Sequence, residues 1–279
     1  MLNSLFIILR EVLEASIIIS ILIAAMNKTS LKTSWIFIAV IIGGLGSLVM
    51  ASHIIFISDS FEGVGQEVLN ATMLFILAVL LTFFVFFYIR YRFLTPSIDR
   101  LLTIILIVIV SMAISREGGE IYIYVNGYVQ SFAESLPLII GASIGAGIGI
   151  SSGAIVYYCL IYSPIHLKQI ISSSVLALIS AGMISESILY LMQADWLDST
   201  QPLWNSSTIV SESSVTGQML YALLAYEATP TGLQVTAYFV TIAVFSVLIN
   251  RAFSLNRQAL NEQSSEQNKS LNANRSVSL

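Results

Sequence analysis

The chain has 279 residues, of which 56% are hydrophobic and 10% are charged, and its formal net charge is −4 at pH 7. A soluble domain usually carries about 25% charged residues, so this composition excludes an ordinary soluble globular protein. Apolar runs of about 20 residues, which are long enough to cross a bilayer as a helix, recur along the chain. The one cysteine, Cys159, excludes an internal disulfide and a thiolate cluster.

Seven apolar windows predict membrane-spanning helices, and they cover residues 2–26, 35–58, 68–90, 101–125, 136–162, 169–193 and 232–250. The predicted fold class is therefore an all-α polytopic membrane protein with seven transmembrane helices. Residues 1–250 are assigned to one seven-helix membrane domain. Residues 251–279 are rich in Ser, Asn and Gln and lack an apolar period, which predicts a polar, disordered cytoplasmic tail.

The basic residues are distributed unevenly between the connections. Of the twelve Lys and Arg residues, ten follow the odd-numbered windows, none follows an even-numbered window, and Arg10 and Arg116 lie inside windows. The even-numbered connections instead carry eight acidic residues. By the positive-inside rule, this division places the N-terminus outside and the C-terminus in the cytoplasm.

Two windows contain the same charged pattern, Arg-Glu-x-x-Glu, although an ionisable residue at mid-bilayer costs about 2.5–3.5 kcal/mol. The copies start 106 positions apart (116 minus 10) and comprise Arg10, Glu11 and Glu14 in "REVLE" and Arg116, Glu117 and Glu120 in "REGGE". Residues three or four apart share a helix face, so each motif places an arginine beside two carboxylates. A buried salt bridge would explain one such motif, but the repeated spacing favours a shared site.

Three windows separate the two motifs, so windows 1–3 and 4–6 are predicted to form an inverted repeat. Many transporters have this plan and bind substrate at the repeat interface near the midplane. Four glutamates against two arginines leave two negative charges if all are ionised. Carboxylate oxygens suit hard cations, and the acidic outer loops would concentrate cations at the entrance. These residues therefore favour cation transport.

The motifs "REVLE" and "REGGE" resemble the paired Arg-Glu-Gly-Leu-Glu signatures of the oxidase-dependent iron permeases of fungi and bacteria. The resemblance covers most of residues 1–250, and "TGQMLYALLAYEATPTGLQVTAYF" at 216–239 is similar to the family's stretch before the last helix. It implies a high-affinity permease that moves iron inward, with iron as transported substrate and no prosthetic group. The implied iron ligands and supporting arginines are Glu11, Glu14, Glu117 and Glu120, with Arg10 and Arg116.

The resemblance also implies a redox partner, either a multicopper oxidase or periplasmic iron-handling proteins. It implies an integral, multi-pass protein of the cytoplasmic membrane of a bacterium.

Three further residues are accessory candidates for the site. Glu67 lies in "QEVLNA", which resembles the family's third-helix segment, although Asn70 stands where a second acid is frequent. Glu186 is an acid inside the sixth window, where a functional role is the default reading and a structural ion pair is the alternative. His53 lies near the outer end of the second window, where a structural role is the alternative to an entry ligand.

Glycine recurs every fourth residue in "GASIGAGIGISSG", at Gly141, Gly145, Gly149 and Gly153. Small residues at this spacing let helices approach closely, which predicts a helix-packing face. The segment "MLYALLAYEA" is compatible with a surface-lying helix or with a short re-entrant helix.

Two other functions fit parts of the pattern. Uptake of another hard divalent cation, such as manganese or magnesium, would use the same carboxylates. An intramembrane glutamate-dependent protease would need histidines at depth to bind metal or to stabilise an oxyanion, and of the two histidines only His53 lies near the membrane. We therefore expect a transporter and no enzymatic activity.

Overall fold

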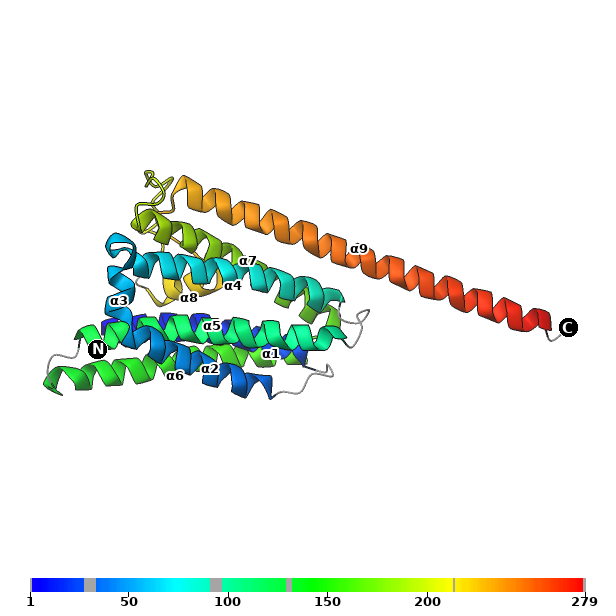
Figure 1. Ribbon diagram of the computed structural model, residues 1–279, viewed down its shortest axis with the longest axis horizontal. Coiled ribbons are helices and arrows are strands. Elements are labelled where there is room, and N and C mark those ends of the chain that lie inside the picture. Colours follow the sequence, from blue (N-terminus) through cyan, green and yellow to red (C-terminus); the bar gives the residue numbers. More distant parts are fainter. Residues whose placement is uncertain (1, 28–33, 91–96, 129–131, 213, 278–279) are drawn as a thin grey trace.

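The computed structural model describes residues 2–27, 34–90, 97–128, 132–212 and 214–277, and these residues form helices joined by loops. The long helices run roughly along one axis (Figure 1), and they are α1 (Leu2–Met26), α2 (Trp35–Ser52), α4 (Gly65–Arg90), α5 (Ser97–Tyr128), α6 (Phe132–Tyr162), α7 (Ile165–Gln193) and α9 (Gly232–Val277). Shorter elements are α3 (Ile54–Asp59), the 3₁₀ helix η1 (Ser60–Gly63) and α8 (Val215–Leu224). The predicted all-α class is confirmed.

Six helices of the described ranges are long and apolar enough to cross a membrane, namely α2, α4, α5, α6, α7 and α9. The chain is therefore an integral, multi-pass membrane protein. Helix α1 is also long enough, with 25 residues, but Arg10, Glu11 and Glu14 distinguish it from the six apolar helices. The seventh span and the orientation stay predictions, and Lys28, Lys32 and Arg92, which the orientation uses, lie outside the described residues.

The helices pack in pairs that join distant parts of the chain. The most extensive contacts join α1 to α6, α2 to α5, and α4 to α7, while α9 packs on α7 and α4. Helix α4 shows the inward pattern clearly, because its fully buried side chains recur every three or four residues at Leu74, Leu77, Leu81 and Phe84. Helix α2 exposes large apolar side chains such as Phe37, Ile41 and Leu45, as expected of a surface that faces lipid.

Glycines bring α6 against the backbone of α1, as the spacing of small residues predicts. A Cβ at Gly145 would lie 2.5 Å from the Leu5 carbonyl oxygen, and one at Gly153 would lie 2.8 Å from Ser16 Cβ. The Ser16 hydroxyl donates to the Gly149 carbonyl across this interface at 2.8 Å. This close approach fixes the position of the first charged motif, which lies on α1.

Two predicted segments differ from the structure. The window 35–58 is not one helix, because α2 ends at Ser52 and His53 (φ −107°, ψ 13°) leads into α3. The polar segment after Asn250, predicted to be disordered, is helical to Val277 as a continuation of α9. Extending an existing helix avoids the cost of nucleation, and Gln, Glu, Ala, Leu, Lys and Arg in this segment are good helix formers. The division into a membrane domain and a cytoplasmic tail stays a prediction.

The segment 215–224 forms α8, a helix of ten residues that packs against α1 and α7. It begins after Ser214, whose hydroxyl accepts a hydrogen bond from the Gly217 amide at 3.0 Å, and it ends at Leu224, after which Ala225 has φ 51°. A Cβ at Gly182 of α7 would lie 2.2 Å from the Ala225 Cβ, so the glycine is what lets α8 approach. This contact brings Tyr221 to the charged residues of α1 and α7.

Candidate functional site

The two charged motifs meet in the interior, where Arg116 of α5 is surrounded by carboxylates from three helices. Its Nη1 lies 2.6 Å from Glu117 Oε1 and 3.3 Å from Glu14 Oε2. Its Nη2 lies 2.8 Å from Glu186 Oε1 and 3.5 Å from Glu120 Oε1. The Arg116 side chain is completely buried, so this guanidinium depends on these carboxylates to offset its lost hydration.

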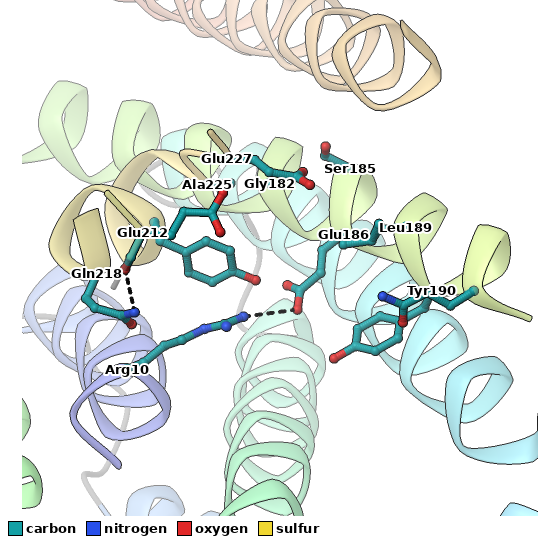
Figure 2. Close-up of a pocket in the computed structure, with 12 residues that line it drawn as sticks. Arg10, Gly182, Ser185, Glu186, Leu189, Tyr190, Glu212, Gln218, Ala225 and Glu227 are labelled. Atoms are coloured by element: carbon teal, nitrogen blue, oxygen red, sulfur yellow. Dashed lines mark hydrogen bonds and ion pairs between the residues drawn. The ribbon is translucent and has the colours of Figure 1, made fainter. Parts of the chain in front are cut away.

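Arg10 of α1 lies on the outer side of the same cluster. Its Nε lies 3.3 Å from Glu14 Oε1 and 3.9 Å from Glu11 Oε1, and its Nη2 lies 3.7 Å from Glu186 Oε1. The guanidinium also stacks over the Tyr221 ring, 3.9 Å from its centroid, which is a favourable cation–π geometry. Figure 2 shows Arg10 extending from α1 toward Glu186 on α7.

Three carboxylates of the two motifs converge on one another. Glu11, Glu117 and Glu120 each present an oxygen, and these three oxygens all lie within 4.8 Å of one another. Glu11 Oε2 and Glu117 Oε2 are buried and have no hydrogen-bond partner in the structure. Buried polar atoms are almost always satisfied, so these oxygens are available to a cation. Glu14 differs from the three because both of its oxygens are engaged by arginines.

Two neutral side chains hold the third carboxylate, Glu120. Its Oε1 accepts hydrogen bonds from Asn70 Nδ2 of α4 and from Tyr190 Oη of α7, each at 3.4 Å. Neither contact was predicted from the sequence. Asn70 stands at a position where a second acid would resemble the iron permeases more closely. Tyr190 carries a signal that could have been used, because it lies one helical turn after Glu186 and so shares its face.

The accessory candidates have different positions. Glu186 joins the cluster through both arginines. His53 is exposed at the end of α2, where its Nδ1 lies 2.9 Å from Ser52 Oγ. Glu67 lies in the first turn of α4 and is half-buried. Within the described ranges, the converging group of possible metal ligands contains neither His53 nor Glu67.

A cavity of about 300 Å³ leads toward the cluster, and its lining includes Arg10, Glu186, Tyr221, Glu212 and Glu227 (Figure 2). Burial raises the pKa of Glu227, and the hydrogen bond donated by Gln234 acts in the opposite direction. A smaller cavity of about 20 Å³ is lined by residues that include Glu14, Glu186 and Tyr221. Arg10 and Glu186 therefore stand between the wider cavity and the buried carboxylates.

The geometry can be compared with known proteins at this point. The family model described as the iron permease FTR1 family matches residues 1–255. No significant match was found among curated proteins or among solved structures. The family model spans all of α1 to α8, including both charged motifs and Glu186, together with most of the apolar part of α9. The chain therefore belongs to the iron permease FTR1 family.

Proposed function

We propose that this protein is a high-affinity permease that moves iron inward across the cytoplasmic membrane of a bacterium, through a site lined by Glu11, Glu14, Glu117 and Glu120. The observation that carries the proposal is the convergence of Glu11, Glu117 and Glu120 from α1 and α5, with two buried oxygens that have no partner. Family membership and the helical membrane fold point to a transporter rather than an enzyme, with iron as substrate rather than cofactor.

The charge of the cluster suits a multivalent cation. The four motif glutamates and two arginines sum to −2 when ionised, and including Glu186 gives −3 (five carboxylates less two guanidinium groups). Carboxylate oxygens are hard ligands, and an inside-negative membrane potential favours inward movement by about 2.3 kcal/mol per charge per 100 mV. Arg10 and Arg116 support the site as ion pairs, because a guanidinium cannot ligate a cation.

The pairing of the helices supports an inverted repeat of windows 1–3 and 4–6, and the distribution of basic residues favours an N-terminus outside. In such a repeat α1 corresponds to α5 and α2 corresponds to α6. The α1–α6 pair therefore corresponds to the α5–α2 pair, and both pairs make extensive contacts. Each pair also has a serine that donates to a glycine carbonyl, Ser16 to Gly149 O and Ser115 to Gly43 O, although the two serines stand at different positions relative to the motifs. Such a repeat would put both motifs near the midplane.

A redox partner on the outer face would complete the proposed system. Its role would be to deliver iron in the required oxidation state, either as a multicopper oxidase or as periplasmic iron-handling proteins. The acidic residues Glu212 and Glu227 at the outer cavity would favour cation arrival there by electrostatic attraction.

The test is uptake of radioactive iron by purified protein in liposomes, normalised to reconstituted protein. Glu11→Gln and Glu117→Gln are each expected to lower uptake at least about tenfold, because an amide is neutral and a weaker ligand; a lost charge-assisted contact typically costs about 1.5–3 kcal/mol. The double variant should lose less than the product of the two single losses, since ligands of one site act together.

The matched control is Glu62→Gln, which removes an exposed carboxylate of η1 and should leave uptake unchanged. Wild-type uptake by the Glu11→Gln/Glu117→Gln double variant would end the proposal. Manganese and magnesium supplied in place of iron test whether the same carboxylates carry another hard cation.

A further inference from the structure

Glu186 belongs to neither charged motif, yet it contacts both arginines with one oxygen. Its Oε1 lies 2.8 Å from Arg116 Nη2 and 3.7 Å from Arg10 Nη2. Its side chain is 12% exposed, and it lines both the wider cavity and the smaller one. Glu186 therefore lies beside the two guanidinium groups and borders the wider cavity.

Each arginine shares its N–H groups between the motif carboxylates and Glu186. Arg116 directs Nη1 to Glu117 and Glu14, while its Nη2 lies closer to Glu186 (2.8 Å) than to Glu120 (3.5 Å). Arg10 directs Nε to Glu14 and, at 3.9 Å, to Glu11, and it directs Nη2 to Glu186. A guanidinium presents its donors in a fixed planar fork, so each arginine can contact Glu186 with one part of the fork and a motif glutamate with another. Without Glu186, the part of each positive charge that it now offsets would also act on the glutamates that a cation must use.

We propose that Glu186 is a positioning residue that takes up part of the positive charge of Arg10 and Arg116, which would otherwise act on the cation ligands alone, and thereby sets the affinity of the site without itself ligating the cation. This inference rests on the function proposed above. Glu186 lies outside the converging group of Glu11, Glu117 and Glu120, and its Oε1 is already shared between Arg116 and Arg10.

Helix α7 supports the ligands in a second way that fits this role. Tyr190, four residues after Glu186, donates to Glu120 at 3.4 Å. The same helix face thus holds Arg116 through Glu186 and Glu120 through Tyr190, and in both cases it acts on the site through another residue. Supporting contacts of this kind fix the orientation of metal ligands and tune their affinity.

The formal charges define a sharp experiment. With every group ionised, the wild-type cluster carries −3 (five carboxylates less two arginines), Glu186→Gln carries −2, and the double variant Glu186→Gln/Arg10→Gln returns to −3. At the few-ångström separations of this cluster, one unit charge changes cation binding by roughly tenfold or more. We therefore expect Glu186→Gln to raise the Kd for iron roughly tenfold and the double variant to restore it.

The measurements are equilibrium binding of radioactive iron to purified protein, and iron K-edge absorption spectra of the loaded protein. A raised Kd in Glu186→Gln with an unchanged iron coordination shell, and recovery in the double variant, supports the proposal. A wild-type Kd in Glu186→Gln overturns it. A changed coordination shell in Glu186→Gln also overturns it, because Glu186 would then be a ligand.

Glu62→Gln is the control for loss of an outer acidic charge, and it should bind iron as wild type does. If Glu186→Gln does not fold, the double variant and Glu186→Asp carry the test. Near-wild-type Kd and an unchanged coordination shell in both support the proposal, and weakened binding or a changed shell in either overturns it.

Glu117→Gln distinguishes failure of this inference from failure of the proposed function. Unchanged iron binding in Glu117→Gln means that the proposed function has failed. Loss of binding there with wild-type binding in Glu186→Gln means that only this inference has failed.

Discussion

Arg116 is the residue on which the charge balance of the cluster depends most. It is completely buried, and its two terminal nitrogens lie within 3.5 Å of carboxylates from α1, α5 and α7. Arg10 makes a similar set of contacts but keeps about a third of its side chain exposed. A buried charge that loses its partners is much more costly than an exposed one, so the two arginines should respond differently to substitution.

Arg116→Lys is expected to leave protein in the membrane and to lower iron uptake about tenfold, since lysine keeps the charge but has one nitrogen in place of the fork. Arg116→Ala should lower the free energy of unfolding by about 3–5 kcal/mol, and Arg10→Ala by less. Uptake and thermal unfolding in detergent measure both effects. Full uptake in the Arg10→Ala/Arg116→Ala double variant would contradict a role for the arginines.

Tyr190 offers a milder test of how Glu120 is held. Tyr190→Phe removes one hydrogen bond to the carboxylate with little change in volume, and a hydrogen bond to a charged group contributes about 1.5–3 kcal/mol. We expect iron affinity to fall about tenfold while the protein stays folded. Tyr122→Phe, which changes an exposed tyrosine of α5, is the control. Equal binding by the two variants would show that Tyr190 does not support the site.

At the scale of the helices, close packing of α6 on α1 positions the first motif. A Cβ at Gly145 would meet the Leu5 carbonyl oxygen at 2.5 Å and the Leu9 amide nitrogen at 3.0 Å, whereas a Cβ at Gly147 would meet nothing within 4 Å. The two glycines lie two positions apart on one helix, and Gly147 is exposed. Alanine substitutions at these two positions therefore distinguish the effect of packing against α1 from the effect of helix propensity.

Gly145→Ala is expected to destabilise the protein by about 1–3 kcal/mol, because α6 must move away from the α1 backbone. Gly147→Ala should be neutral or stabilise the helix by about 0.5–1 kcal/mol. Thermal unfolding of the two variants in detergent, together with iron uptake, measures the difference. Equal stability of the two variants would mean that the α1–α6 contact is looser than the structure indicates.

The last helix shows how packing extends an element beyond its apolar window. The window ends at residue 250, yet Ala252 is fully buried and Asn256 Nδ2 donates to the Ile89 carbonyl of α4 at 2.9 Å. These contacts tie the start of the polar segment to the end of α4. In Figure 1 the rest of α9 continues well past the other helices.

At the scale of the whole molecule, orientation follows from the distribution of charge. With ten basic residues after the odd-numbered windows and none after the even-numbered ones, the positive-inside rule favours a cytoplasmic C-terminus. A reporter fused after Asn250 should be cytoplasmic, and a tag within residues 198–208 should be accessible from outside. Detection of both on the same side of the membrane would rule out the seven-span topology.

The sequence by itself determined the class of protein and identified the two charged motifs of the candidate site. Hydropathy identified the helices because a bilayer demands long apolar segments whose backbone groups are satisfied internally. The repeated Arg-Glu-x-x-Glu spacing identified the two motifs because carboxylates three apart project from one side of a helix. Composition misjudged the polar segment after Asn250, and the apolar window 35–58 did not reveal the helix end at Ser52.

Only the tertiary structure decided which side chains meet. Contacts between helices depend on how faces pack, and no local pattern encodes that Glu11 converges with Glu117 and Glu120 while Glu14 faces the arginines. The same holds for Glu186, which lies 70 positions after Arg116 in the sequence but 2.8 Å from it in the fold. Helical periodicity fixes which residues share a face, whereas the packing of α1, α5 and α7 fixes which faces form the site.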